Sequence, residues 1–144
     1  MPDQLTTPGP GASDGLRVRP VPGEVAAVVE RLIRGLQARG VQLFAVIDHA
    51  AGARTAGLAL GDEVLVVLGD PAVGTSLMQA DPRCGLDLPL RVLVWSDGGA
   101  TWLAFQDPDL LAERYAVAAE QPTLDGMRGL LEGLAAELSS PATV

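Results

Sequence analysis

The residues with the most suggestive chemistry stand at the ends of predicted strands. Asp48 and His49 follow one apolar run, Asp70 follows the next, and Asp87 comes just before a third. An imidazole beside carboxylates can act as a general acid or base, and carboxylates in one small volume can share a proton or hold a divalent ion. The sequence therefore predicts a pocket near these four residues, provided that the turns carrying them converge.

His49 is the only histidine, and with Asp48 it forms the candidate catalytic pair. At a strand end, where α/β proteins place ligands, His49 would serve as a general base, or as a metal ligand together with Asp70 and Asp87. The alternative is structural: Asp48 and Asp70 cap helices, Asp87 forms a turn, and His49 packs at the edge of the layers. We favour the structural alternative for His49 and predict no metal site.

A glycine-rich stretch from Gly69 to Ser76 has the setting of a phosphate-binding loop, because it follows a predicted strand and opens a predicted helix. Its two glycines match that pattern, but Thr75 stands where the pattern requires lysine, and the chain contains no lysine. Nucleotide hydrolysis is therefore disfavoured, whereas one small anion would still fit at the helix N-terminus. The predicted ligand-binding residues are Asp48, His49, Gly69, Asp70, Gly74, Thr75 and Asp87.

Cys84 is the only cysteine, so an intramolecular disulfide and a Cys-rich zinc site are both impossible. It would be a nucleophile only with His49 in hydrogen-bond reach, and no cysteine-hydrolase spacing surrounds it. Trp95 and Trp102 face each other loosely across a predicted hairpin and suit packing or a subunit surface better than base stacking. The cofactor, if there is one, stays unknown.

Composition narrows the classes of protein that fit. With 144 residues and 48% hydrophobic content, the chain suits one core. A net charge of −8 makes nucleic acid and anionic membranes unfavourable partners, because clustered Lys and Arg supply phosphate contacts. The first residues do not read as a signal peptide and no apolar run is long enough to span a membrane, so we expect a cytoplasmic protein.

Hydrophobic spacing places the elements that must position these residues. Residues 16–19 alternate as a strand, and 22–39 carry one helical stripe that ends at Gly40. Residues 41–47 are apolar nearly throughout, which predicts a strand buried on both faces or beneath a helix. The remaining predictions are a strand at 63–68, helices at 49–56, 71–80, 107–118 and 123–139, a loop at 83–89, and a hairpin of 90–95 with 100–105.

Helices that alternate with strands predict an α/β (α+β) two-layer sandwich, in which a mixed sheet of about five strands carries the helices. We expect a single domain at 16–139, with a disordered N-terminal tail at 1–15 and a C-terminal tail at 140–144.

Several motifs together resemble the bacterial and archaeal family catalogued as domain of unknown function 302, over about residues 16 to 120. They are Val46-Ile47-Asp48-His49-Ala50-Ala51-Gly52-Ala53, Gly57-Leu58, Gly69-Asp70-Pro71, Gly74-Thr75-Ser76-Leu77-Met78, Leu86-Asp87-Leu88-Pro89-Leu90, Asp107-Pro108, and Leu111-Ala112-Glu113-Arg114-Tyr115. The resemblance implies a compact two-layer domain without an established activity, often a homodimer, and it selects Asp48, His49 and Asp87. This chain departs from the family pattern at Asp70, usually Asn, and at Phe105, usually Tyr.

Three hypotheses follow from the sequence. The favoured one is a domain that binds a small molecule in the predicted pocket. The second is an enzyme that uses His49 as acid or base with a carboxylate partner. The third is a structural homodimer whose interface is the functional surface, without a pocket.

Overall fold

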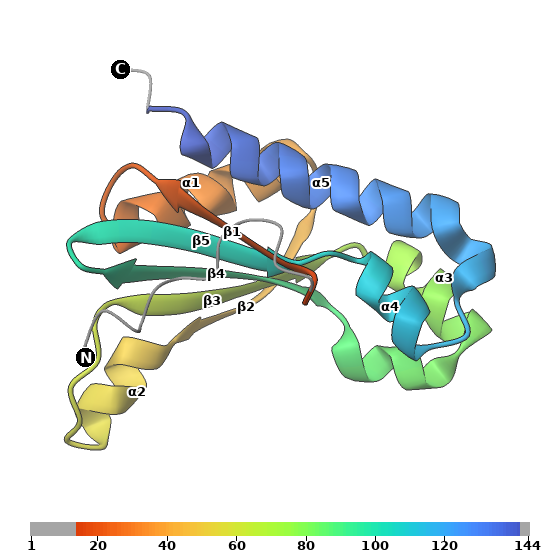
Figure 1. Ribbon diagram of the computed structural model, residues 1–144, viewed down its shortest axis with the longest axis horizontal. Coiled ribbons are helices and arrows are strands. Elements are labelled where there is room, and N and C mark those ends of the chain that lie inside the picture. Colours follow the sequence, from red (N-terminus) through yellow and green to blue (C-terminus); the bar gives the residue numbers. More distant parts are fainter. Residues whose placement is uncertain (1–13, 142–144) are drawn as a thin grey trace.

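The computed structural model describes residues 14–141, in which helices pack on a five-stranded sheet (Figure 1). The strands are β1 (Leu16–Val21), β2 (Gln42–Asp48), β3 (Glu63–Gly69), β4 (Leu90–Asp97) and β5 (Ala100–Gln106). The helices are α1 (Val25–Ala38), α2 (His49–Thr55), α3 (Pro71–Ala80), α4 (Asp109–Arg114) and α5 (Gln121–Ser139), with 3-10 turns η2 (Pro82–Asp87) and η3 (Ala118–Glu120). The predicted α/β architecture is confirmed. The predicted tails fall outside the described residues, apart from residues 14, 15, 140 and 141.

The sheet order is β1-β5-β4-β3-β2, and all four pairings are antiparallel, where the alternating elements had suggested a mixed sheet. Helix length explains the difference. The seven residues of α2 span about 10 Å, whereas the seven residues of β3 extend about 23 Å. Helix α2 is therefore too short to carry the chain back to the starting end of β2. Strand β3 consequently begins where β2 ends and pairs with it antiparallel. Only α1, with 14 residues, makes a true crossover, and it joins strands at opposite edges.

Helices α1 and α5 cover one face of the sheet (Figure 1). The apolar stripe predicted for the first helix packs here, and Gly40, with φ of 66°, ends it in the left-handed conformation as predicted. The fully buried residues of this main core include Val28, Leu32, Val66, Leu103, Leu134 and Leu138.

A second, smaller core joins α3, η2, α4 and the start of α5 beyond the end of the sheet. It consists of Leu77, Cys84, Leu111, Val117, Leu124 and Met127. Helix α5 begins at Gln121 with Pro122 in its first turn, two residues before the predicted start at residue 123. The predicted loop at 83–89 is largely η2.

Strand β2 is the main correction to the predicted core. All seven of its residues are exposed, although the sequence predicted burial. The reason is its position at the edge of the sheet, where among residues 14–141 it has a neighbour on one side only. Its large apolar side chains, Leu43, Phe44, Val46 and Ile47, are each between 38% and 45% exposed.

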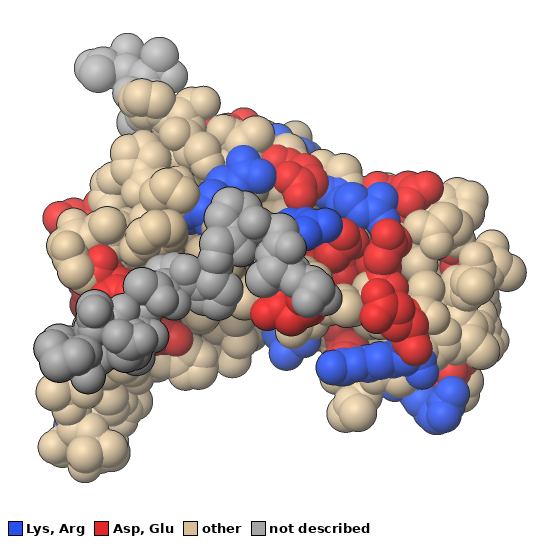
Figure 2. All heavy atoms as spheres, in the orientation of Figure 1, with Lys and Arg blue, Asp and Glu red and all other residues tan. Residues whose placement is uncertain are grey.

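A network of ion pairs ties β1, α4 and α5 together. Asp107 accepts hydrogen bonds from Arg17 at 2.7 Å, from Arg128 at 3.2 Å, and from the backbone amide of Asp109 at 3.0 Å. Arg128 also pairs with Asp109 and, at 2.9 Å, with Asp125. Figure 2 shows basic and acidic side chains interspersed over α4 and the adjoining part of α5. Asp107 is therefore the junction of three elements.

Candidate functional site

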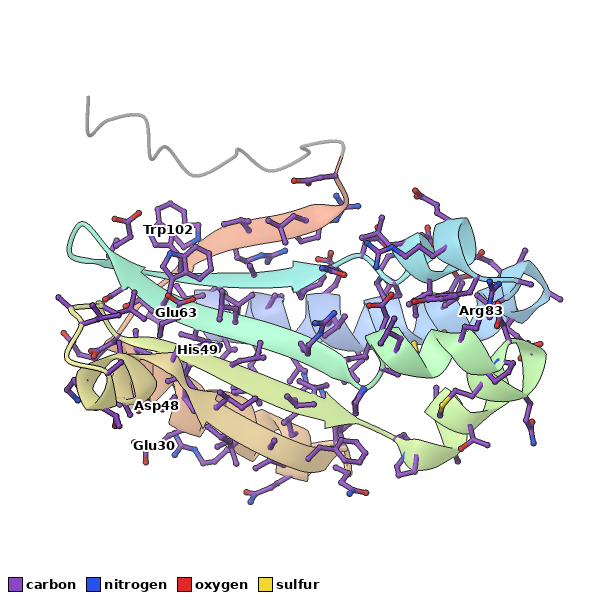
Figure 3. The ribbon with its side chains drawn as sticks, turned by 90° about the horizontal axis from the view of Figure 1, so that it is seen from below. Glu30, Asp48, His49, Glu63, Arg83 and Trp102 are labelled. Carbon is purple, nitrogen blue, oxygen red and sulfur yellow. The ribbon has the colours of Figure 1, made fainter. Side chains whose placement is uncertain are left out.

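The strand ends that were predicted to converge lie at opposite ends of the sheet. Asp48 pairs with Val64, and Gly69 pairs with Gln42, so β2 alone separates the two groups by roughly 20 Å. In Figure 3, Asp48 and His49 lie near Glu63, and Arg83 of η2 lies at the other end. The convergence rule applies to parallel sheets, whose carboxyl ends share an edge. Within one chain, the single pocket predicted near Asp48, His49, Asp70 and Asp87 is therefore wrong.

The Asp48 side chain has the predicted structural use. Its Oδ1 accepts a hydrogen bond from the backbone amide of Ala51 at 2.9 Å and so caps α2. His49 is exposed at the first position of that helix, and it lines neither of the two cavities described below. Across residues 14–141, no three His, Cys, Asp or Glu side chains gather closely enough to hold a metal ion.

A cavity of about 770 Å³ lies between α3 and α5, beside the ends of β3 and β4. We call it the α3–α5 cavity. Four of the predicted ligand-binding residues line it: Gly69, Asp70, Gly74 and Thr75. The opposite wall was not predicted, and it includes Phe44, Leu90, Thr123, Gly126, Met127 and Leu130.

The polar groups of α3 at this cavity are largely engaged with their own helix. Asp70 Oδ1 accepts from the amide of Ala72 at 2.9 Å, as predicted for a cap. Thr75 donates its hydroxyl to the carbonyl of Pro71 at 2.6 Å, and Ser76 donates to the carbonyl of Val73 at 2.8 Å. The cavity wall is consequently apolar, and among residues 14–141 Asp70 is the only charged residue on it.

Asp87 lies in a different place, at the end of η2. Its Oδ2 accepts from the Tyr115 hydroxyl at 2.7 Å and from Arg114 at 2.9 Å. The hydrogen bond from Tyr115, together with the Arg114 guanidinium, lowers the pKa of the Asp87 carboxyl despite its partial burial. Asp87 lines a second cavity of about 390 Å³ and does not reach the α3–α5 cavity. The motif that ends in Arg114 and Tyr115 was the only sequence signal for these partners.

Asp81, which directly follows α3, is a buried acceptor. It accepts from the amide and the guanidinium of Arg83 and from the amide of Ala116 at 3.0 Å. The hydrogen bond from the Arg83 side chain is the main reason why the pKa of Asp81 lies well below its usual range. Cys84 beside it is fully buried, and burial raises the pKa of its thiol, which opposes a nucleophilic role.

These carboxylates predict sensitivity to acid. The pKa values of Asp81, Asp87 and Asp107 are lowered in the folded state, the last because hydrogen bonds and Arg128 outweigh its burial. Groups with a depressed folded pKa add stability above their unfolded pKa, near 3.9, and this stability is lost as the pH falls through the folded value. We expect urea denaturation to give constant stability near pH 6 and a steep loss below about pH 4. Asp87→Asn should make that loss shallower, and unchanged stability down to pH 2 would contradict the prediction.

Comparison with known proteins supports one family. The model described as "Domain of unknown function DUF302" matches residues 18–134. The crystal structure of the uncharacterized conserved protein DUF302 from Bacillus stearothermophilus has a TM-score of 0.67 and 20% identity, covering 86% of this chain and 95% of that one. At this identity the structure shows a shared fold.

Curated relatives match over a shorter region. Fluoride-specific ion channel FluC 1 of Brucella suis is 44% identical over 94 residues, which is 65% of this chain and 37% of the channel protein. FluC 1 of Brucella abortus and FluC 2 of Brucella melitensis are also 44% identical, over 35% of their length. The chain thus spans about a third of these relatives. No helix among residues 14–141 has the length and apolar character needed to cross a membrane.

Proposed function

This chain belongs to the DUF302 family, a domain of unknown function, and we propose that it binds a small, largely apolar molecule in the α3–α5 cavity. The size and lining of that cavity carry the proposal. Ligand sites in proteins measure about 300–1,000 Å³ and are mostly apolar with a few polar groups. The α3–α5 cavity, at about 770 Å³, has both properties.

The charge of the wall selects the class of ligand. Asp70 is exposed and is the only charged residue that lines the cavity in the described part of the chain. A carboxylate attracts a cation and repels an anion, so the ligand has an apolar body with a neutral or amine end. The anion considered from the sequence is less favoured, because no arginine of the described residues lines the cavity.

The enzyme hypothesis has less support. His49 is exposed and Asp48 is engaged as a helix cap. A general base must lie within hydrogen-bond reach of the proton that it removes, and neither residue lines the α3–α5 cavity.

Filling the cavity from α5 tests the proposed function. A Cβ atom added at Gly126 would meet nothing within 4 Å, and Gly126 lines the cavity. Gly129 on the same helix is equally open but does not line it. Gly126→Leu should abolish binding of the neutral apolar dye Nile red, followed by fluorescence, whereas Gly129→Leu should leave it unchanged. Both variants should be more stable than the parent by about 0.5–1 kcal/mol, because leucine has the higher helix propensity.

Displacement of the dye tests the ligand class. Hexylamine and hexanol should displace Nile red at lower concentration than hexanoate, and Asp70→Asn should reduce the difference between the amine and the acid. Equal binding of the dye to Gly126→Leu and to the parent would overturn the location of the site. Preference for hexanoate would overturn the ligand class alone.

A further inference from the structure

We propose that two copies of this chain pair antiparallel along their β2 strands, and that Asp48 and His49 of each copy thereby stand beside the α3–α5 cavity of the other. The pairing itself is independent of the proposed function, whereas the composite site rests on it. The proposal begins from the exposed edge of β2.

The two edges of the sheet differ in how they resist pairing. Edge strands are commonly protected by charged side chains or proline. Strand β1 carries Arg17, Arg19 and Pro20. Strand β2 carries no basic residue and no proline, and its only charge is Asp48 at the end. Its four large apolar side chains are each exposed, and because successive residues of a strand point to opposite faces, they border the open edge on both faces of the sheet.

The occupant that best fits this edge is a second copy of the same strand. In a twofold pairing, one residue of β2 lies opposite the same residue of the second copy, and the two copies contribute identical surfaces. A bulge between Leu43 and Ala45 interrupts the ladder with β3, so the regular part of β2 is Ala45 to Asp48. Centring the pair on Val46 uses this regular part and places the small Ala45 opposite the large Ile47 of the second copy. In this register, Asp48 faces Phe44 and no two like charges are opposed.

This register has a consequence for the predicted site residues. Antiparallel pairing lays the Asp48 end of one β2 against the Gln42 end of the other. Gln42 is the partner of Gly69 in β3, and Phe44 and Gly69 both line the α3–α5 cavity. Asp48 and His49 of the second copy therefore arrive at the end of the sheet that holds Asp70. Asp48 and His49 lie far from Asp70 within one chain, but in this pairing they come close to Asp70 of the second copy.

The residues of the second copy also specify which end group of the ligand the site would contact. The second copy adds a carboxylate and an imidazole to a cavity edge where Asp70 is the only charged lining residue between positions 14 and 141. Both side chains are exposed in the single chain, and Asp48 caps α2 through its Oδ1 atom alone, which leaves Oδ2 to face a ligand end. An amine or hydroxyl group directed at Asp70 would meet His49 of the second copy on its other side.

The association is tested by light scattering on size-exclusion fractions. The parent protein should elute with twice the chain mass of 14.9 kDa, and Val46→Lys should elute as a folded single chain. Leu86→Lys is the matched control, because Leu86 is the most exposed large apolar side chain and lies in η2 at the other end of the fold. It should remain a dimer. A monomeric parent, or a dimer that survives Val46→Lys, would overturn the pairing.

The register is tested by a cross-link at its centre. Opposed residues in antiparallel strands have Cα atoms about 4.5–5.5 Å apart, within the range of about 4.4–6.8 Å that a disulfide requires. Val46→Cys should become a covalent dimer when an added oxidant removes two electrons and two protons from the paired thiols. Leu86→Cys should not, and Cys84 is buried and should not interfere. Cross-linking at both positions would reject the register.

A double-mutant comparison tests the composite site. His49→Ala should weaken hexylamine binding at least threefold in the dimer and should change nothing in the Val46→Lys background. If His49→Ala has no effect in the dimer while Gly126→Leu still abolishes dye binding, the composite site fails and the proposed function stands. If Gly126→Leu also has no effect, both fail.

Discussion

Replacing Leu77 by Ala is expected to lower the free energy of unfolding by about 2–5 kcal/mol and to loosen the wall of the α3–α5 cavity. Leu77 is fully buried and is the α3 residue at the centre of the second core, where it joins Leu111, Leu124 and Met127. Removing its side chain leaves a void, and this small core has few neighbouring side chains that could repack to fill it. Nile red binding should weaken together with stability, because α3 supplies one side of the cavity.

The matched control for Leu77→Ala is Leu138→Ala. Leu138 is also fully buried, but it lies on α5 in the main core, which α5 forms with α1 and the sheet. It should lose stability to a similar extent in urea denaturation while dye binding in the folded protein stays intact. Hydrogen exchange should show lost protection in α3, η2 and α4 for Leu77→Ala only. Equal loss of dye binding in both variants would mean that the cavity depends on global stability alone.

Replacing Asp107 by Ala is the second large effect, with an expected loss of about 2–3 kcal/mol. The Asp107 side chain is only 12% exposed and receives hydrogen bonds from Arg17, Arg128 and the amide of Asp109. Its removal leaves two guanidinium groups without their shared partner and leaves the start of α4 without an acceptor. The expected loss is moderate because both arginines keep contact with water.

Asp125→Ala provides the contrast, since Asp125 contacts the same Arg128 at 2.9 Å with a side chain that is 56% exposed. Exposed ion pairs contribute about 0–1 kcal/mol, so this variant should stay within about 0.5 kcal/mol of the parent in urea denaturation. Comparable losses for Asp125→Ala and Asp107→Ala would show that burial does not set the strength of this network.

Local sequence signals predicted local structure well. Asp48 and Asp70 cap the helices assigned to them, Gly40 ends α1, and the turn at Ser96–Gly99 joins an antiparallel hairpin. Each of these features depends on residues close in sequence. Strand order and direction do not, since they depend on whether a connecting helix is long enough to cross the sheet. The exposure of β2 followed from that order and could not be inferred from its apolar composition.

The candidate site divides in the same way. Gly69, Asp70, Gly74 and Thr75 were found because a strand, a cap and a helix adjoin in sequence. The facing wall on α5 comes from more than 40 residues later in the sequence. The α5 wall of the cavity was not predicted because its residues are far in sequence from those of α3.

The Phe44 side chain, at the bulge of β2, lines the α3–α5 cavity and is also exposed at the edge of the sheet. In the proposed dimer, thermodynamic reciprocity would link ligand binding to self-association: a molecule that holds the ring in place would strengthen self-association by the same factor by which self-association strengthens its binding. Titration midpoints would shift with dilution, so the domain would respond to its own abundance as well as to its ligand.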